Sequence, residues 1–163
     1  MTALSNRSLV DIDRDNLIHP VVSFRGHEKH GPRILESGQG MWLTDIDGRR
    51  MIDAFAGLWC VNVGYGQESI VAAATEQLRK LPYATGFFHY GCEPAIRLAG
   101  ELCALAPEGL DHVYFTLGGS DAVDSAIRYI VHYWNAVGQP QKKHFIAQAN
   151  GYHGSSSLGS GLT

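Results

Sequence analysis

The feature that most constrains the fold is an alternation of apolar and helical segments between residues 112 and 149. An apolar run over 112–116 leads into a glycine-rich turn at 118–120, an amphipathic helix is predicted over 120–137, and a second apolar run covers 144–149. Strand, helix and strand in this order are typical of a βαβ unit, whose parallel strands carry their connecting helix packed on one face of the sheet. The sequence therefore predicts an α/β fold.

The turn at 118–120 admits two interpretations. Gly119 has no Cβ, so a ligand can approach its backbone closely, and the free N–H groups of the helix start point at the same place. An anion such as phosphate suits that place, because the helix dipole and the Ser120 hydroxyl both favour negative charge there. Alternatively, Ser120 only caps the helix and the glycines only form the turn. The residues of the turn alone leave both interpretations open.

Regular patterns also occur earlier in the chain. Residues 40–57 alternate apolar and polar side chains around an Asp-Gly dipeptide, which predicts two short antiparallel strands joined by a tight turn. Apolar residues at helical spacing predict helices over 68–80 and 94–106. Residues 1–39 show little periodicity, so we expect an irregular arm that wraps around a surface without a core of its own.

Charge and hydropathy exclude several classes of function. The net charge is −3 and the basic residues are scattered, so we expect no nucleic-acid partner. No apolar run reaches the ~18 residues of a membrane span, and the N-terminus lacks the apolar core of a signal peptide. We therefore expect a cytoplasmic protein with no membrane partner.

The spacing of the cysteines and histidines supports neither a disulfide framework nor a metal site. The three cysteines do not form a Cys-x-x-Cys pair, which argues against a disulfide framework and against a zinc site. The tetrapeptide from His27 to His30 is one residue too short for the zinc-protease motif His-Glu-x-x-His. The sequence predicts no metal site. It also lacks the Gly-rich motifs of nucleotide P-loops and dinucleotide-binding folds.

Two segments with aromatic residues suggest that the turn at 118–120 is part of a ligand-binding site. Tyr152 and His153 follow the second predicted strand, so they should emerge at the same edge of the sheet as Ser120, where open α/β sheets bind ligands. An aromatic ring beside a phosphate site suggests a flat ligand. Leu58 and Trp59 lie among glycines in an irregular segment, and simple packing of the aromatic ring under a loop is the alternative there.

Four motifs in this order and spacing carry a family resemblance: DAFAGLWCVNVGYG, LPYATGFF, YFTLGGSDAVDSAIR and GYHGSS. Together they resemble the N-terminal portion of class III aminotransferases dependent on pyridoxal 5'-phosphate (PLP), in the omega-transaminase or amine:pyruvate group. The resemblance implies fold type I, with a mainly parallel sheet in the large domain, and a homodimer with active sites at the subunit boundary. It places an N-terminal arm and small-domain hairpin at 1–57 and the first part of the PLP-binding large domain at 58–163.

The resemblance also implies cofactor-binding residues. The family's phosphate-binding turn falls on Gly119 and Ser120, and the aromatic residue that stacks on the pyridine ring falls on Tyr152, with His153 beside it. At the preceding position many relatives have serine, whereas this sequence has Gly118. One side-chain donor to the phosphate is therefore missing.

Substrate-binding residues follow from the same resemblance. Leu58 and Trp59 match the substrate pocket of the amine:pyruvate group, and Phe87 matches a pocket aromatic that relatives contribute across the dimer interface. An apolar, aromatic pocket favours amines with a hydrophobic or extended body. The implied reaction moves an amino group from a primary amine donor to a keto acid acceptor such as pyruvate, with PLP as the electron sink.

No catalytic residue is predicted within this chain. None of its four lysines stands in the family's Schiff-base context, and the lysine of relatives lies beyond the position matching Thr163. We therefore expect the front part of an aminotransferase, cut inside the large domain and inactive by itself. Two alternatives stay open, namely a non-catalytic phosphate-ligand or dimerisation fragment, and another fold type I PLP enzyme such as an aminomutase or decarboxylase.

Overall fold

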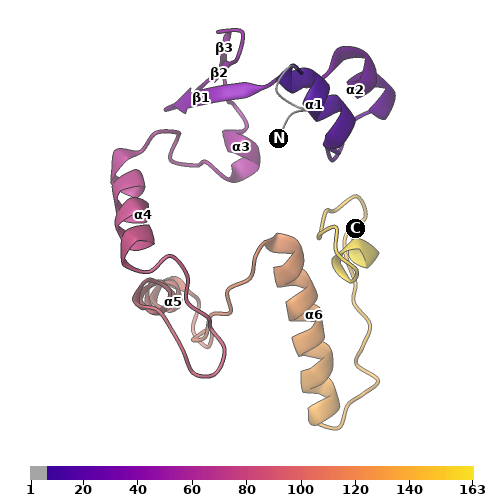
Figure 1. The fold of residues 1–163 in the computed structure, drawn as a ribbon. Coiled ribbons are helices and arrows are strands. Elements are labelled where there is room, and N and C mark those ends of the chain that lie inside the picture. The colour runs from indigo at the N-terminus through magenta and orange to yellow at the C-terminus, as the bar shows by residue number, and fades with distance from the viewer. Residues whose placement is uncertain (1–6) are drawn as a thin grey trace. The chain divides into compact units, whose positions relative to one another are not determined.

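The computed structural model describes residues 7–163, and the chain divides into two compact units, Met1–Tyr83 and Ala84–Thr163. Figure 1 shows the order of their helices and strands along the chain. The first unit contains α1 to α4 and a small sheet, and the second contains α5, α6 and a short 3-10 helix, η1. The boundary that the family resemblance places between residues 57 and 58 stays a prediction.

Two short helices open the first unit, α1 (Leu9–Asn16) and α2 (Phe24–His30). Each follows a serine, Ser8 or Ser23, whose side chain accepts a hydrogen bond from a backbone N–H of the first turn. The expectation of an irregular arm over 1–39 is therefore wrong for this part of the chain. Helices of eight and seven residues span about two turns, which is too short for an apolar repeat to stand out in the sequence.

An antiparallel sheet follows, with strands β1 (Leu35–Gln39), β2 (Trp42–Asp45) and β3 (Arg50–Ile52) in that order. The hairpin of β2 and β3 confirms the prediction around Asp47 and Gly48, and β1 adds a third strand from the region expected to be irregular. The Asp45 carboxylate is only 1% exposed and accepts hydrogen bonds from two backbone N–H groups of the turn. This buried carboxylate fixes the turn.

Two further helices complete the first unit. The short α3 (Ala56–Trp59) lies in the glycine-rich segment that the sequence singled out for substrate binding. The longer α4 (Glu68–Lys80) has the predicted bounds and ends before Pro82, whose ring disfavours helical backbone at the residue before it.

The second unit is built on α5 (Glu93–Leu105) and α6 (Gly119–Ala136), close to the helices predicted from periodicity. After α6 the chain runs back along the helix to η1 (Gly159–Leu162), which lies beside the first turns of α6 (Figure 1). Residues far apart in the sequence therefore meet at the N-terminal end of α6.

The two predicted strands on either side of α6 are not formed in the part of the chain that the structure describes. Residues 112–116 and 144–149 carry no strand pairing, and β1 to β3 form the one sheet within residues 7–163. A parallel strand is defined by its hydrogen bonds to a neighbour, so an apolar run without that neighbour stays unpaired. Ile146 in the second run is fully exposed, as expected for a strand that lacks its sheet.

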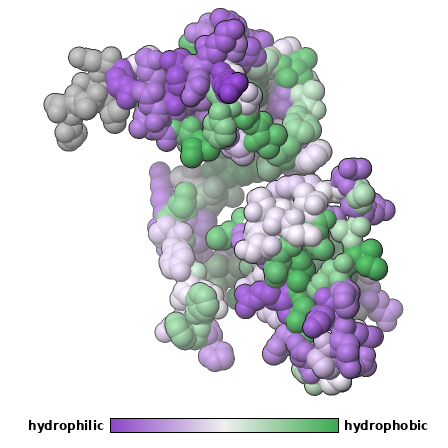
Figure 2. Space-filling view, turned by 90° about the vertical axis from the view of Figure 1, so that its right-hand side faces the viewer, coloured by the Kyte–Doolittle hydropathy of each residue, from purple (hydrophilic) through white to green (hydrophobic). Residues whose placement is uncertain are grey.

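Few hydrophobic side chains are covered. Among residues 7–163, Ile127 on α6 is the one buried hydrophobic residue, at 9% exposure. Ile130, three positions further along the helix, is 44% exposed. Figure 2 shows hydrophobic residues at the surface in broad patches. Within the described residues, no helix combines the length and apolar character that crossing a membrane requires.

Candidate cofactor and substrate site

The first turn of α6 presents its backbone without side-chain cover. The N-cap residue is Gly118, which makes no side-chain hydrogen bond to the helix start, and Ser120 already lies within the helix. The alternative in which Ser120 caps the helix is therefore wrong. A Cβ built on Gly119 would meet no atom within 4 Å. The helix start thus keeps its free N–H groups and open space above them, which is the geometry of an anion site.

The loop that follows the second apolar run lies directly against this turn. The backbone N–H of Ser155 donates to Ser120 Oγ over 3.1 Å, and Ser156 Oγ donates to the Ser120 carbonyl over 3.2 Å. Gly154 has φ +125°, and a Cβ there would come within 3.1 Å of Ser120 Cα. Because the backbone angle would strain a residue with a Cβ and the close approach leaves little room for one, glycine is strongly favoured at 154.

Asp124 ties the loop to α6 one turn further along. Its Oδ1 accepts a hydrogen bond of 2.7 Å from the backbone N–H of Gly159, and its Oδ2 accepts one of 3.4 Å from that of Leu158. The Ser156 side chain and these backbone donors stabilise the ionised carboxylate, so the pKa of Asp124 lies below its ordinary value. Sequence analysis gave Asp124 no role, because its partners lie 34 and 35 residues away.

The two predicted ring-contact residues lie differently within this loop. Tyr152 is 75% exposed, so its ring is free to stack on a flat ligand. His153 is half-buried, and its backbone N–H donates to Thr163 Oγ1 over 3.0 Å. Its Nε2 is buried and has no hydrogen-bond partner. The loop therefore offers Tyr152 outward while His153 helps to hold the loop.

In the first unit, one carboxylate organises the segment that carries the predicted substrate residues. Asp53 accepts hydrogen bonds from the backbone N–H groups of Phe55 (3.1 Å) and Gly57 (2.7 Å) and from the hydroxyl of Tyr65 (2.7 Å). The hydrogen bond from Tyr65, followed by those from the backbone, holds the pKa of Asp53 below its ordinary value. The same bond raises the pKa of Tyr65, because it stabilises the protonated hydroxyl.

Backbone strain is concentrated in this segment. Ala56, Leu58 and Trp59 have φ of 47°, 60° and 63°, although residues with a Cβ rarely adopt left-handed backbone. Trp59 is 71% exposed and touches Phe55 at a ring-centroid distance of 5.1 Å. Within the first unit most of the Trp59 ring is therefore not covered by a loop, and its role in substrate binding stays a prediction.

Phe87, the third predicted substrate residue, belongs to the second unit. It is 73% exposed and lies beside Phe88, whose ring centroid is 6.1 Å away. Phe88 itself has φ 57°, so this segment also departs from ordinary backbone. The structure thus places Leu58 and Trp59 together in one unit, and Phe87 with the turn at Gly119 and Ser120 in the other.

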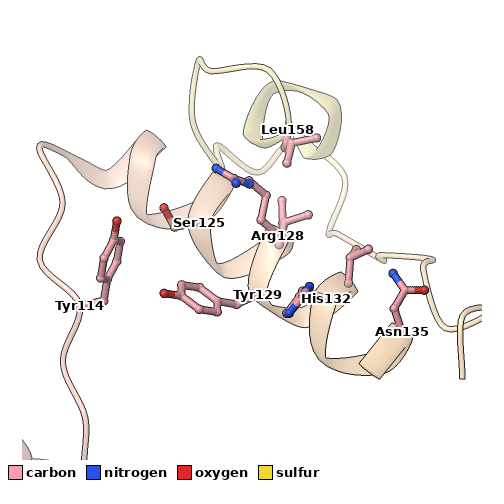
Figure 3. A pocket seen from close by; sticks show the side chains of 9 residues that line it. Tyr114, Ser125, Arg128, Tyr129, His132, Asn135 and Leu158 are labelled. Atoms are coloured by element: carbon pink, nitrogen blue, oxygen red, sulfur yellow. The ribbon is translucent and has the colours of Figure 1, made fainter. Parts of the chain in front are cut away.

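A cavity of about 670 Å³ lies along the side of α6 (Figure 3). The rings of Tyr114 and Tyr129 meet edge to face at 5.9 Å on its wall, and His132 and Asn135 line it further along the helix. None of the residues predicted to bind cofactor or substrate lines this cavity. Gly119 and Ser120 in particular are not among its lining residues.

The family model and the similar proteins all describe aminotransferases. The family model described as aminotransferase class-III matches residues 24–163. A putrescine–pyruvate aminotransferase of Pseudomonas aeruginosa is 43% identical over 162 residues, which cover 99% of this chain and 36% of the relative. A beta-alanine–pyruvate aminotransferase of the same species is 40% identical over 131 residues, which cover 80% of this chain and 29% of the relative.

A solved structure shows the same backbone. The omega transaminase from Pseudomonas jessenii, in complex with PMP, superposes with a TM-score of 0.88 at 38% identity, covering 91% of this chain and 33% of that one. The chain thus spans about a third of the length of the curated relatives it matches.

Proposed function

The chain belongs to the class III aminotransferase family, and we propose on this premise that the complete protein is a PLP-dependent aminotransferase. It moves an amino group from a primary amine or omega-amino compound to a keto acid such as pyruvate. The relatives named for putrescine and beta-alanine as donors and pyruvate as acceptor support this choice of substrates. When bound, PLP supplies the electron sink for the exchange.

The observation that carries the proposal is the N-terminal turn of α6 with the loop packed against it. The open space over Gly119 gives a phosphate access to the backbone N–H groups. Since Ser120 Oγ already accepts a hydrogen bond from the N–H of Ser155, its own hydroxyl hydrogen remains to be donated to a phosphate oxygen. The exposed ring of Tyr152 is available to stack on the pyridine ring.

The strained segment of the first unit supports an apolar amine pocket. Asp53 holds the backbone on which Leu58 and Trp59 expose 58% and 71% of their surface. Apolar side chains presented in this way contact the carbon chain of a donor and leave its amino group free to react. Phe87 joins them from the other subunit of a homodimer, as the family resemblance implies. The cytoplasmic location predicted from the sequence stays a prediction.

The test replaces Gly119 in the complete protein. Gly119→Val fills the space that the phosphate needs, so the purified variant should retain little PLP by absorbance and form little alanine from pyruvate and putrescine. Gly100→Val is the matched control, because Gly100 is a helical glycine on α5 that also has no atom within 4 Å of its Cβ position. Ser120→Ala should weaken PLP binding by about 1–2 kcal/mol. Unchanged PLP affinity in both site variants would refute the proposal.

A further inference from the structure

The first unit holds a cluster of three side chains that can ligate a metal and that the aminotransferase proposal does not use. Asp13 lies on α1, His27 on α2, and His19 on the linker between the two helices. One ligand atom of each lies within 4.8 Å of the other two. The cluster forms because the linker turns the two helices back toward each other.

Both histidines point a ring nitrogen at the same carboxylate. His19 Nε2 lies 2.9 Å from Asp13 Oδ2, and His27 Nε2 lies 3.1 Å from Asp13 Oδ1. The two imidazole rings are 4.9 Å apart between centroids and tilted by 47°. Two nitrogens and two oxygens therefore converge on one small volume.

Two of these converging atoms lack a satisfactory partner inside the protein. The His27 side chain is 10% exposed and that of Asp13 is 14% exposed. His27 Nε2 and Asp13 Oδ1 are both buried, and although they lie 3.1 Å apart, neither makes a hydrogen bond. Buried polar atoms are nearly always paired. A cation bound by both atoms would satisfy both.

We propose that Asp13, His19 and His27 bind one divalent transition-metal ion of the zinc class. Two imidazoles and a carboxylate are a donor set that suits zinc and its neighbours in the first transition row. Bonds of about 2.0–2.2 Å in a tetrahedral site place ligand atoms roughly 3.4 Å apart. The separations from each histidine nitrogen to an Asp13 oxygen, 2.9 and 3.1 Å, are somewhat shorter than this value, and the three ligand atoms lie within 4.8 Å of one another, so side-chain rotations complete the site.

The surroundings give the ion access and a place for a fourth ligand. Cavities of about 310 and 460 Å³ are both lined by His19 and His27. His19, with 33% of its side chain exposed, is the entry side, and a water from these cavities can complete the tetrahedron. The ion would join α1, the linker and α2 through three bonds.

The ligand set of Asp13, His19 and His27 is not the His-Glu-x-x-His motif that the residues after His27 partly resemble. The tetrapeptide from His27 to His30 has the wrong spacing for a zinc-protease helix. The partners of His27 instead lie 8 and 14 positions away, His19 on the linker and Asp13 on α1. Only the fold around the linker reveals them.

The experiment titrates the purified, metal-free protein with Zn²⁺ by calorimetry and records its thermal melting with and without the ion. One equivalent should bind and raise the melting temperature. His27→Ala and Asp13→Asn should each weaken binding by at least about tenfold, the scale of even outer-shell changes at zinc sites. Asp13→Asn keeps the shape of the side chain and so guards against a variant that fails to fold. His30→Ala, on the same helix but outside the cluster, should bind as the unchanged protein does.

Three outcomes would overturn the site. These are no saturable Zn²⁺ binding, binding that Asp13→Asn and His27→Ala leave unaltered, and equal losses in the His30→Ala control. In each case the cluster would be purely structural, with the Asp13 carboxylate accepting hydrogen bonds from the ring N–H groups of His19 and His27. The result is independent of the aminotransferase proposal, because PLP retention and alanine formation are not its readouts.

Discussion

Two irregular segments of the molecule each donate backbone N–H groups to one carboxylate, but over very different distances along the chain. Asp53 binds donors 2, 4 and 12 residues away, so the substrate segment is organised within its own stretch of sequence. Asp124 binds backbone donors 34 and 35 residues away, so the cofactor loop depends on α6 and on the return of the chain along it. Local closure costs less chain entropy than long-range closure. The cofactor loop should therefore be the easier of the two to release.

The largest effect is expected at Asp124. Asp124→Ala removes the two carboxylate oxygens that accept hydrogen bonds from Leu158 and Gly159. The complete protein should therefore lose PLP at least about tenfold faster, the scale of one hydrogen bond to a charged group. Limited proteolysis should also cut the loop after residue 150 sooner. Asp121→Ala, in the first turn of α6, is the matched control and should not loosen PLP binding. If PLP dissociates at the same rate from the unchanged protein and from the Asp124 variant, the hydrogen bonds between Asp124 and the loop do not hold the cofactor site.

A smaller and different effect is expected at Asp53. Asp53→Ala removes the support of the left-handed backbone at Leu58 and Trp59, so the KM for the amine donor should rise by about tenfold. PLP retention should stay unchanged, because the phosphate-binding turn does not involve this carboxylate. Steady-state kinetics and PLP absorbance measure the two quantities separately. Loss of PLP in this variant would show that the two segments are not independent.

Next in size is a change of donor preference at Trp59. Trp59→Ala removes a ring that is 71% exposed, so the ratio of kcat/KM between a bulky and a small amine should shift by about fivefold to tenfold, with PLP still bound. Trp42→Ala is the control, since Trp42 lies in β2 with the Arg50 guanidinium 4.8 Å above its ring. A loss of PLP with no change in preference would place Trp59 outside the substrate pocket.

The smallest effect is expected from alkaline pH, and it separates the two carboxylates. The pKa of Tyr65 is raised above its ordinary 10.0, so its bond to Asp53 stabilises the fold below pH 10 and is lost as pH rises through the raised value. Both carboxylates have lowered pKa values, so their bonds persist above pH 3.8 and fail as pH falls through those lowered values. The hydrogen bonds around Asp53 are thus lost at both acid and alkaline pH, because Tyr65 ionises at the alkaline end. The hydrogen bonds to Asp124 are lost only at acid pH.

Fluorescence can detect this alkaline step. With every other tryptophan of the protein replaced by Phe, Trp42 and Trp134 among them, Trp59 reports on its own segment, and its emission should change above pH 10. Tyr65→Phe should abolish that change, because the phenylalanine ring has no hydroxyl to ionise. An alkaline transition that survives in Tyr65→Phe would assign it to another group.

Local patterns were predictable where a short stretch of sequence determines the structure. The helix over 68–80 shows its apolar repeat within one element, and the hairpin turn needs only Asp47 and Gly48 beside the strands. The four family motifs likewise needed no structure. The helices α1 and α2 escaped prediction because they are too short for a repeat, and the apolar runs at 112–116 and 144–149 were predicted as strands although strand pairing depends on a neighbour.

The sequence by itself determined the family, the glycine turn that begins α6, and the identity of the residues proposed to hold cofactor and substrate. The tertiary structure alone decided which side chains meet. It brought Gly154 against Ser120, placed Asp124 under the loop, and gathered His19 and His27 around the Asp13 carboxylate. The physical reason is that propensity, periodicity and turn chemistry act over a few residues, whereas these contacts join elements whose approach depends on how the intervening chain folds back.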